Sequence, residues 1–89
     1  MTDIESGTDL RGELRDYVAE AFLYMHPGVE LQDGDSFLEL GVIDSLGFVE
    51  LVEEVQTRYG IAVQDVEITE ENFGSIDALV AFVEAKRAA

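Results

Sequence analysis

The chain has 89 residues, 47% of them hydrophobic, so it can form one domain with a single small core and is too apolar for a disordered acidic tail. Twenty acidic residues against five basic ones give a net charge of −15, which argues against binding to nucleic acids or anionic membrane surfaces. The absence of cysteine excludes disulfide scaffolds, thiolate metal sites and a cysteine nucleophile.

We expect residues 1–7 to form a flexible N-terminal leader and residues 8–89 to form the folded domain. The leader has neither the basic start nor the apolar stretch of a signal peptide. No apolar run approaches the length of a membrane span. The sequence therefore predicts a soluble cytoplasmic protein.

A first helix is predicted to begin after Thr8 or Asp9 as its N-cap and to end at His26, because Pro27 disfavours the helical conformation there. Its apolar residues recur at spacings of three and four, which predicts one buried face. These residues are Leu10, Leu14, Tyr17, Val18, Ala21, Phe22 and Met25. Gly12 weakens this helix by about 1 kcal/mol relative to Ala.

Residues 28–43 have no sustained period and contain three glycines among scattered apolar residues. We predict a long loop that its apolar side chains pin to the core. Loops of this length are uncommon in compact domains and often functional.

A second helix is predicted from Asp44 or Ser45 to Gly60, which occupies a C-cap position. Its core stripe is Phe48, Leu51, Val52, Val55 and Tyr59. Residues 61–68 alternate only briefly, which is a weak strand pattern, and residues 69–73 favour one short helical turn.

Ser75 is predicted to cap a last helix. Its inward-facing residues are Ile76, Leu79, Val80 and Val83. The predicted fold is therefore all-α: a small four-helix bundle, with three main helices and one short helix, and a long first loop.

Neither catalysis nor metal binding has a convincing motif in this sequence. The single histidine, His26, lies before a proline, where a solvated or capping histidine is expected. Asp33-Gly34-Asp35 resembles the start of a calcium loop, but Phe37 occupies the next ligand position. We therefore expect no catalytic residue and no metal site.

The segment Asp44-Ser45-Leu46 places a serine hydroxyl at the start of the second helix. A phosphate ester there would be stabilised by free amide groups and by the helix dipole, although an ordinary cap explains the dipeptide alone. An exposed row is predicted on the same helix. It consists of Leu46, Val49, Glu50 and Glu53. Apolar residues ringed by carboxylates suit transient docking to a basic partner.

No Lys or Arg occurs between Arg15 and Arg58. That interval holds ten carboxylates: Asp16, Glu20, Glu30, Asp33, Asp35, Glu39, Asp44, Glu50, Glu53 and Glu54. A solvated acidic face explains solubility, but it does not explain why basic residues are excluded around one serine.

Residues 37–52, Phe-Leu-Glu-Leu-Gly-Val-Ile-Asp-Ser-Leu-Gly-Phe-Val-Glu-Leu-Val, resemble the 4′-phosphopantetheine attachment region of acyl carrier proteins. The resemblance extends over roughly residues 8–85 and includes the long loop and the acidic helix. It implies that Ser45 accepts phosphopantetheine from coenzyme A, with Asp44 presenting the serine to a magnesium-dependent transferase. The thiol that the sequence lacks would then lie at the tip of this arm.

The resemblance also implies roles for partners. Leu46, Val49, Glu50 and Glu53 would form the docking surface for the phosphopantetheinyl transferase, for a loading ligase or acyltransferase, and for downstream synthase enzymes with basic patches. The carrier itself, expected to be a monomer, would catalyse nothing and would deliver acyl or aminoacyl thioesters.

Three residues depart from the pattern of primary fatty-acid carriers, namely Ile43, Gly47 and Glu53. The sequence is closer to carriers of specialised pathways such as polyketide synthesis, nonribosomal peptide synthesis or aminoacyl transfer. Two alternatives stay open on residues alone: an acidic helical adaptor that binds a basic protein, and a small hydrolase that uses Ser45 with His26.

Overall fold

The computed structural model describes residues 5–88, and residues 1–4 and 89 lie outside the described part. Within it the chain forms helices and irregular segments without a strand, which confirms the predicted all-α class. The elements are α1 (Glu5–Ala21), the 3₁₀ turn η2 (Leu23–Met25), α2 (Phe37–Leu40), α3 (Ser45–Tyr59), the 3₁₀ turn η3 (Asp65–Glu67), α4 (Glu70–Phe73) and α5 (Ile76–Ala88).

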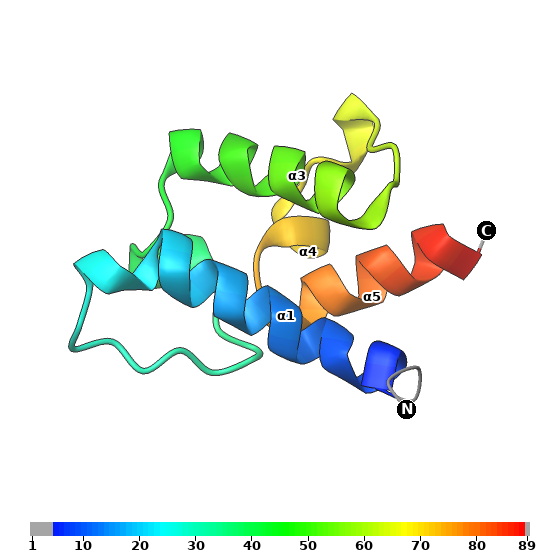
Figure 1. Cartoon of the computed structure of the whole chain (residues 1–89). Coiled ribbons are helices and arrows are strands. Elements are labelled where there is room, and N and C mark those ends of the chain that lie inside the picture. The colour runs from blue at the N-terminus through cyan, green and yellow to red at the C-terminus, as the bar shows by residue number, and fades with distance from the viewer. Residues whose placement is uncertain (1–4, 89) are drawn as a thin grey trace.

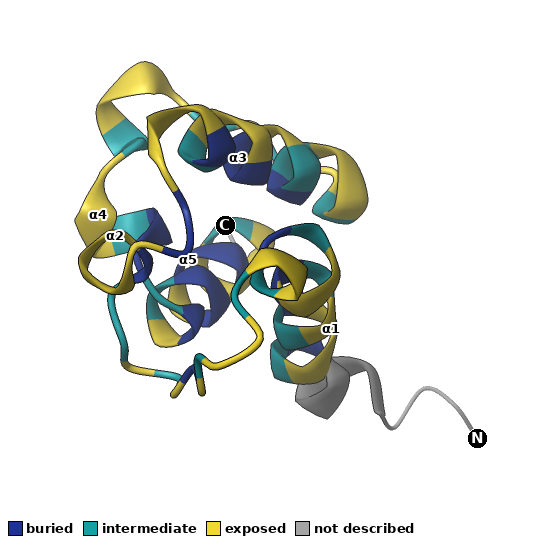
Figure 2. Ribbon diagram, turned by 90° about the vertical axis from the view of Figure 1, so that its left-hand side faces the viewer, coloured by how far each residue is buried: buried dark blue, intermediate teal, exposed yellow. Residues whose placement is uncertain are grey.

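The three long helices α1, α3 and α5 enclose the core (Figure 1). Figure 2 shows that the buried residues of α3 lie on the side turned toward α1 and α5. The predicted stripes supply this core, with Leu14, Leu51 and Leu79 each at most 1% exposed. Phe73 of α4 is also fully buried and packs against the ring of Phe82, with 4.9 Å between the ring centroids.

The first helix differs from its prediction at both ends. It begins at Glu5, three residues before the predicted cap, because extending an existing helix is far less costly than starting one. The leader predicted for residues 1–7 otherwise lies outside the described residues. At the other end α1 stops at Ala21, and the chain tightens into η2 before Pro27. Met25 consequently leaves the buried stripe and is 57% exposed.

The long first loop contains one helical turn that the sequence analysis did not predict. The Ser36 hydroxyl accepts a hydrogen bond from the Glu39 amide at 3.2 Å, and Gly41 closes α2 in the left-handed conformation, with φ of 75°. Phe37 anchors this turn in the core, and its amide donates to the carbonyl of Gly74 at 2.8 Å. A single buried aromatic residue between a serine cap and a glycine is therefore enough to define a helical turn here.

Hydrogen bonds to arginine hold the earlier part of the loop against α1 and α5. Asp33 accepts from Arg11 at 2.9 Å and from Arg15, while Arg15 also donates to the carbonyl of Leu31 at 3.1 Å. Burial alone would raise the pKa of Asp33, but the hydrogen bonds from both guanidinium groups outweigh it and leave that pKa below 3.8. The Asp77 amide also donates to the carbonyl of Asp33 at 2.9 Å, which ties the loop to α5.

The second half of the chain follows the predictions more closely. Helix α3 runs to Tyr59, and Gly60 caps it with φ of 64°. Thr69 caps α4, and the Ser75 hydroxyl accepts from the Ala78 amide at the start of α5. The weak strand pattern at residues 61–68 forms no strand, because the turn η3 interrupts it.

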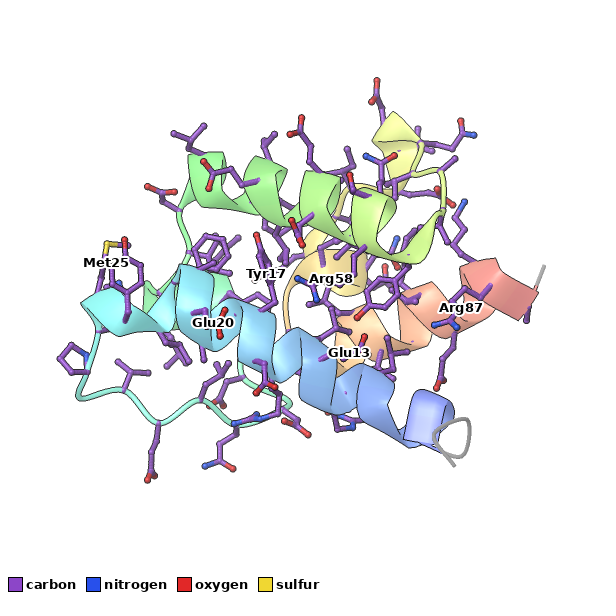
Figure 3. All side chains as sticks on the ribbon, in the orientation of Figure 1. Glu13, Tyr17, Glu20, Met25, Arg58 and Arg87 are labelled. Carbon is purple, nitrogen blue, oxygen red and sulfur yellow. The ribbon has the colours of Figure 1, made fainter. Side chains whose placement is uncertain are left out.

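Aromatic and charged side chains join the three long helices away from the start of α3 (Figure 3). The Tyr59 hydroxyl donates to Glu13 at 3.0 Å, and the Arg58 guanidinium lies 5.4 Å from the centre of the Tyr17 ring. Burial, together with the hydrogen bond to Glu13, raises the pKa of Tyr59 to about 12. Arg87 of α5 lies over the Tyr59 ring. None of the helices in residues 5–88 has the length and hydrophobicity to span a bilayer.

Candidate functional site

Ser45 is the first residue of α3 and is exposed. Asp44 is the N-cap, and its Oδ1 accepts a hydrogen bond from the Gly47 amide at 2.8 Å. Because Asp44 performs the capping, the Ser45 hydroxyl is not required for it. The structure therefore places an exposed hydroxyl at the positive end of a 15-residue helix, as the sequence predicted.

Buried residues on both sides fix the position of Ser45. Val42 and Ile43, just before the cap, are 3% and 2% exposed, and the Val42 amide donates to the carbonyl of Phe37 at 3.1 Å. On the other side, Gly47 is buried against Phe22. The serine thus lies at the surface on a helix turn that is packed on its inner side.

Gly47 meets a packing requirement that the sequence pattern does not reveal. A Cβ atom at this residue would lie 2.9 Å from a ring carbon of Phe22 and 3.1 Å from a methyl carbon of Ile43. Real Cβ atoms essentially never approach as closely as the first of these distances, and the second is tighter than nine in ten of their contacts. The glycine therefore permits close packing between α3 and the end of α1, in addition to lowering helix propensity.

The row predicted on α3 is exposed throughout. Leu46 is 70% exposed and Val49 is 51% exposed, while Glu50 and Glu53 are exposed carboxylates on the same helix. In contrast, Leu51 and Val55 are fully buried. The structure thus separates the two stripes of α3, with one turned toward the core and the other exposed to solvent. Within the predicted core stripe, Phe48 and Tyr59 are only half-buried.

A groove of about 430 Å³, absent from the sequence predictions, lies next to this row. Its walls come from η2 and from the first turns of α3. The lining residues are Ala21, Phe22, Tyr24, Met25, His26, Gly41, Val42, Asp44, Leu46, Gly47 and Glu50. The one signal for this groove in the sequence was Pro27. It shortens the first helix but does not indicate where Tyr24 and Met25 point.

The segment Asp33-Gly34-Asp35, which resembles the start of a calcium-binding loop, has a structural role. Asp33 forms ion pairs with Arg11 and Arg15, and the Asp35 carboxylate accepts from the Gln32 amide at 2.9 Å. Among the side chains that the structure describes, those of residues 10–88, no group of three or more potential metal-ligating residues of the His, Cys, Asp or Glu types comes together. The triplet therefore anchors the loop.

The surroundings of Ser45 fit a covalent phosphate ester. Its exposed hydroxyl can form the ester bond, and the amides of the first turn of α3 together with the helix dipole favour a phosphate. Since the chain contains no cysteine, any thiol for thioester chemistry would have to come from the attached group.

The family model described as "Phosphopantetheine attachment site" matches residues 12–83 of the chain. The chain belongs to the phosphopantetheine-attachment family. The match lies within the predicted domain of residues 8–89 and includes α3 and its flanking loops. It confirms a carrier protein on which 4′-phosphopantetheine is attached covalently. Carriers of this family work with a phosphopantetheinyl transferase and with partner ligases or synthases, and they are generally not catalysts themselves.

Curated relatives are similar over most of the chain. A D-alanyl carrier protein from Streptococcus suis is 34% identical over 61 residues, covering 68% of this chain and 76% of the relative. One from Streptococcus pyogenes is 34% identical over 73 residues, covering 80% and 91%, and one from Streptococcus sanguinis is 31% identical over 72 residues, covering 81% and 87%. These relatives agree with the prediction of a carrier for a specialised pathway rather than for primary fatty-acid synthesis.

Proposed function

We propose that Ser45 is the residue that carries the 4′-phosphopantetheine arm. The observation that carries this proposal is the exposed Ser45 hydroxyl at the start of α3, with Asp44 occupying the N-cap position. The cap hydrogen bond from the Gly47 amide to Asp44 orders the first turn without using the serine. The hydroxyl is therefore free to form a phosphodiester.

The residues around Ser45 position and stabilise the ester. The start of α3 would favour the phosphate through the helix dipole and through the amides that the Asp44 cap does not use, and the buried Val42 and Ile43 keep this end of the helix in place. We assign Asp44 a second role, as the carboxylate that faces the transferase and its metal. The attached group, when present, supplies the terminal thiol on which acyl or aminoacyl groups are held as thioesters.

We further propose that Leu46, Val49, Glu50 and Glu53 form the surface on which partner enzymes dock. Their exposure, with two apolar side chains beside two carboxylates, supports this assignment. An exposed surface of this kind favours fast, charge-steered association with a basic partner. Rapid dissociation is equally necessary, because a carrier must leave each enzyme after one step.

The chain itself catalyses no step in this account, and its partners act on the cargo. They include a ligase or acyltransferase that loads the arm and synthases that use the product. Because the curated relatives are D-alanyl carrier proteins, we propose that the cargo is an amino acid, and D-alanine is the first candidate to test. We place the protein in the cytoplasm, where coenzyme A and the transferase are available to it.

The test is to incubate the purified protein with coenzyme A, Mg²⁺ and a phosphopantetheinyl transferase of broad specificity, and to measure the intact mass. The wild-type protein should gain the mass of one phosphopantetheine group. Ser45→Ala should abolish the gain, whereas Ser75→Ala, which removes the cap of α5, should preserve it. Modification of Ser45→Ala to the wild-type extent would overturn the assignment.

A further inference from the structure

The groove beside the docking row offers three exposed apolar side chains from two elements. Tyr24 and Met25 of η2 are 68% and 57% exposed, and Leu46 of α3 is 70% exposed. All three line the groove, and Figure 3 shows the Met25 side chain extending from η2 toward the start of α3. Exposed apolar side chains that converge on one depression are typical of a protein-binding surface.

The charges around the groove are almost entirely negative. Asp44 and Glu50 line it, and its lining contains no Lys or Arg; His26 is the one other titratable group besides Tyr24. Exposed Glu20 on α1 and Glu53 on α3 add carboxylates to the elements that form its walls.

The basic residues of the chain are engaged elsewhere. Arg11 and Arg15 pair with Asp33, Arg58 pairs with Glu54, and Lys86 pairs with Glu67. Arg87 lies over the Tyr59 ring, 5.8 Å from its centre. Since no basic side chain neutralises the groove, it suits a cationic partner.

The groove also begins at the two neighbours of Ser45. Asp44 and Leu46 line it, so an enzyme whose active site reaches the Ser45 hydroxyl covers this part of α3. Leu46 and Glu50 belong to the docking row and to the groove at once. The two surfaces are therefore continuous.

We propose that the groove is part of the docking surface for the phosphopantetheinyl transferase, with η2 as its second wall. The transferase would place there an apolar side chain flanked by Lys or Arg. The apolar side chain would contact Met25, Tyr24 and Leu46, and the cation would approach Asp44 and Glu50. This inference rests on the proposed attachment at Ser45, and it adds two residues from outside α3 to partner recognition.

The experiment measures steady-state transfer from coenzyme A to the full-length protein by a purified phosphopantetheinyl transferase. In the double variant Tyr24→Ser and Met25→Ser, KM for the carrier should rise by about fivefold or more, the effect of losing an interface contact worth about 1 kcal/mol. The turnover number should change less than about twofold, because the reacting hydroxyl is untouched. The midpoint of thermal unfolding should stay at the wild-type value, because both side chains are exposed.

A pair of variants separates the charge from the shape of the groove. Met25→Lys should raise KM more than Met25→Gln, because the added cation would face the cation of the transferase.

Glu50→Gln should raise KM and reduce the dependence of KM on salt, whereas Glu84→Gln on α5 should do neither. Val66→Ser, at an 84% exposed residue of η3, is the matched apolar control and should leave KM unchanged.

The possible failures are distinguishable. If the wild-type protein is modified at Ser45 but KM is unaffected by changes at Tyr24 and Met25, the transferase contacts α3 without η2 and the groove proposal is wrong. Equal KM values for Met25→Lys and Met25→Gln would likewise contradict a cation in the groove. If the wild-type protein takes up no phosphopantetheine, the attachment proposal fails and the groove proposal fails with it.

Discussion

Gly47 connects the position of Ser45 to the core through the absence of a side chain. Its missing Cβ leaves room for the ring of Phe22, and its amide donates to Asp44. In sequence terms a glycine in the first turn of a helix signals weak propensity, and the close contact with a residue 25 positions earlier cannot be seen. The local preference and the packing therefore act in opposite directions at this position.

Gly47→Ala should lower the free energy of unfolding by about 1 kcal/mol, because overpacking against Phe22 outweighs the gain in helix propensity. The control is Gly12→Ala in α1, where a Cβ would have no neighbour within 4 Å. That variant should raise the free energy of unfolding by about 0.5–1 kcal/mol. Urea denaturation of both variants measures the difference, and stabilisation by both substitutions would contradict the packing role of Gly47.

Two leucines of α3 test the separation of its faces. Leu51 is fully buried and Leu46 is 70% exposed. Leu51→Ala should cost about 2–5 kcal/mol of stability, whereas Leu46→Ala should stay within about 0.5 kcal/mol of the wild-type protein. Chemical denaturation measures both values, and a larger loss for Leu46→Ala would show that the two faces are assigned the wrong way round.

At the scale of elements, the long first loop is held by charge as well as by apolar contacts. Asp33 receives hydrogen bonds from two arginines of α1, and its carbonyl accepts from the amide of Asp77 at α5. Phe37 and Leu31 add buried anchors on the same segment. This loop leads to the cap of α3, so its attachment helps to define where Ser45 lies.

Asp33→Asn should lower the free energy of unfolding at pH 7. It should also remove part of the loss of stability that the wild-type protein shows as the pH falls. The folded protein holds the pKa of Asp33 below the ordinary value of 3.8. The carboxylate therefore contributes stability above about pH 3.8, and this contribution disappears as the pH falls through the lower folded-state pKa.

Urea midpoints at neutral and acidic pH measure this effect. The difference between the wild-type protein and Asp33→Asn should be largest at neutral pH and vanish at low pH. Asp16→Asn makes the same change in net charge at an exposed residue of α1 and serves as the control. Equal midpoints for the two variants at pH 7 would contradict a stabilising role for the Asp33 ion pairs.

The elements that were predictable from sequence are those defined by local signals. Asp44, Gly60 and Ser75 mark helix ends through caps and turns, and each lies at the predicted boundary. The turns η2 and α2 were missed for different reasons. The periodicity of α1 extended to Met25, but the chain tightens after Ala21, and α2 depends on Phe37 reaching the core.

The candidate site was predictable in the same sense. The Asp-Ser-Leu segment and the spacing of the α3 row are local, so Ser45 and the exposed residues Leu46, Val49, Glu50 and Glu53 could be named from sequence. The groove requires η2 and α3 to meet in space. Its second wall could therefore be found only in the folded structure.

For the whole molecule, the distribution of charge matters more than its sum. The net charge is −15, yet the five basic residues contact carboxylates or aromatic rings away from the groove beside Ser45. Figure 3 shows Arg58 and Arg87 at a distance from Met25 and the start of α3. In the proposed docking mode, this distribution of charge would draw a basic partner toward the end of α3 that presents the serine.

Localisation of the modification within one peptide decides whether Ser45 carries the phosphopantetheine arm. Trypsin cleaves after Arg15 and Arg58, so residues 16–58 are released together. The aliphatic hydroxyl residues of this peptide, which could compete for the group, are Ser36, Ser45 and Thr57. Fragmentation of this peptide from transferase-treated protein should place the phosphopantetheine on Ser45 and leave Ser36 and Thr57 bare. A modified peptide with the group on either of the other two residues, and with Ser45 bare, would contradict the account.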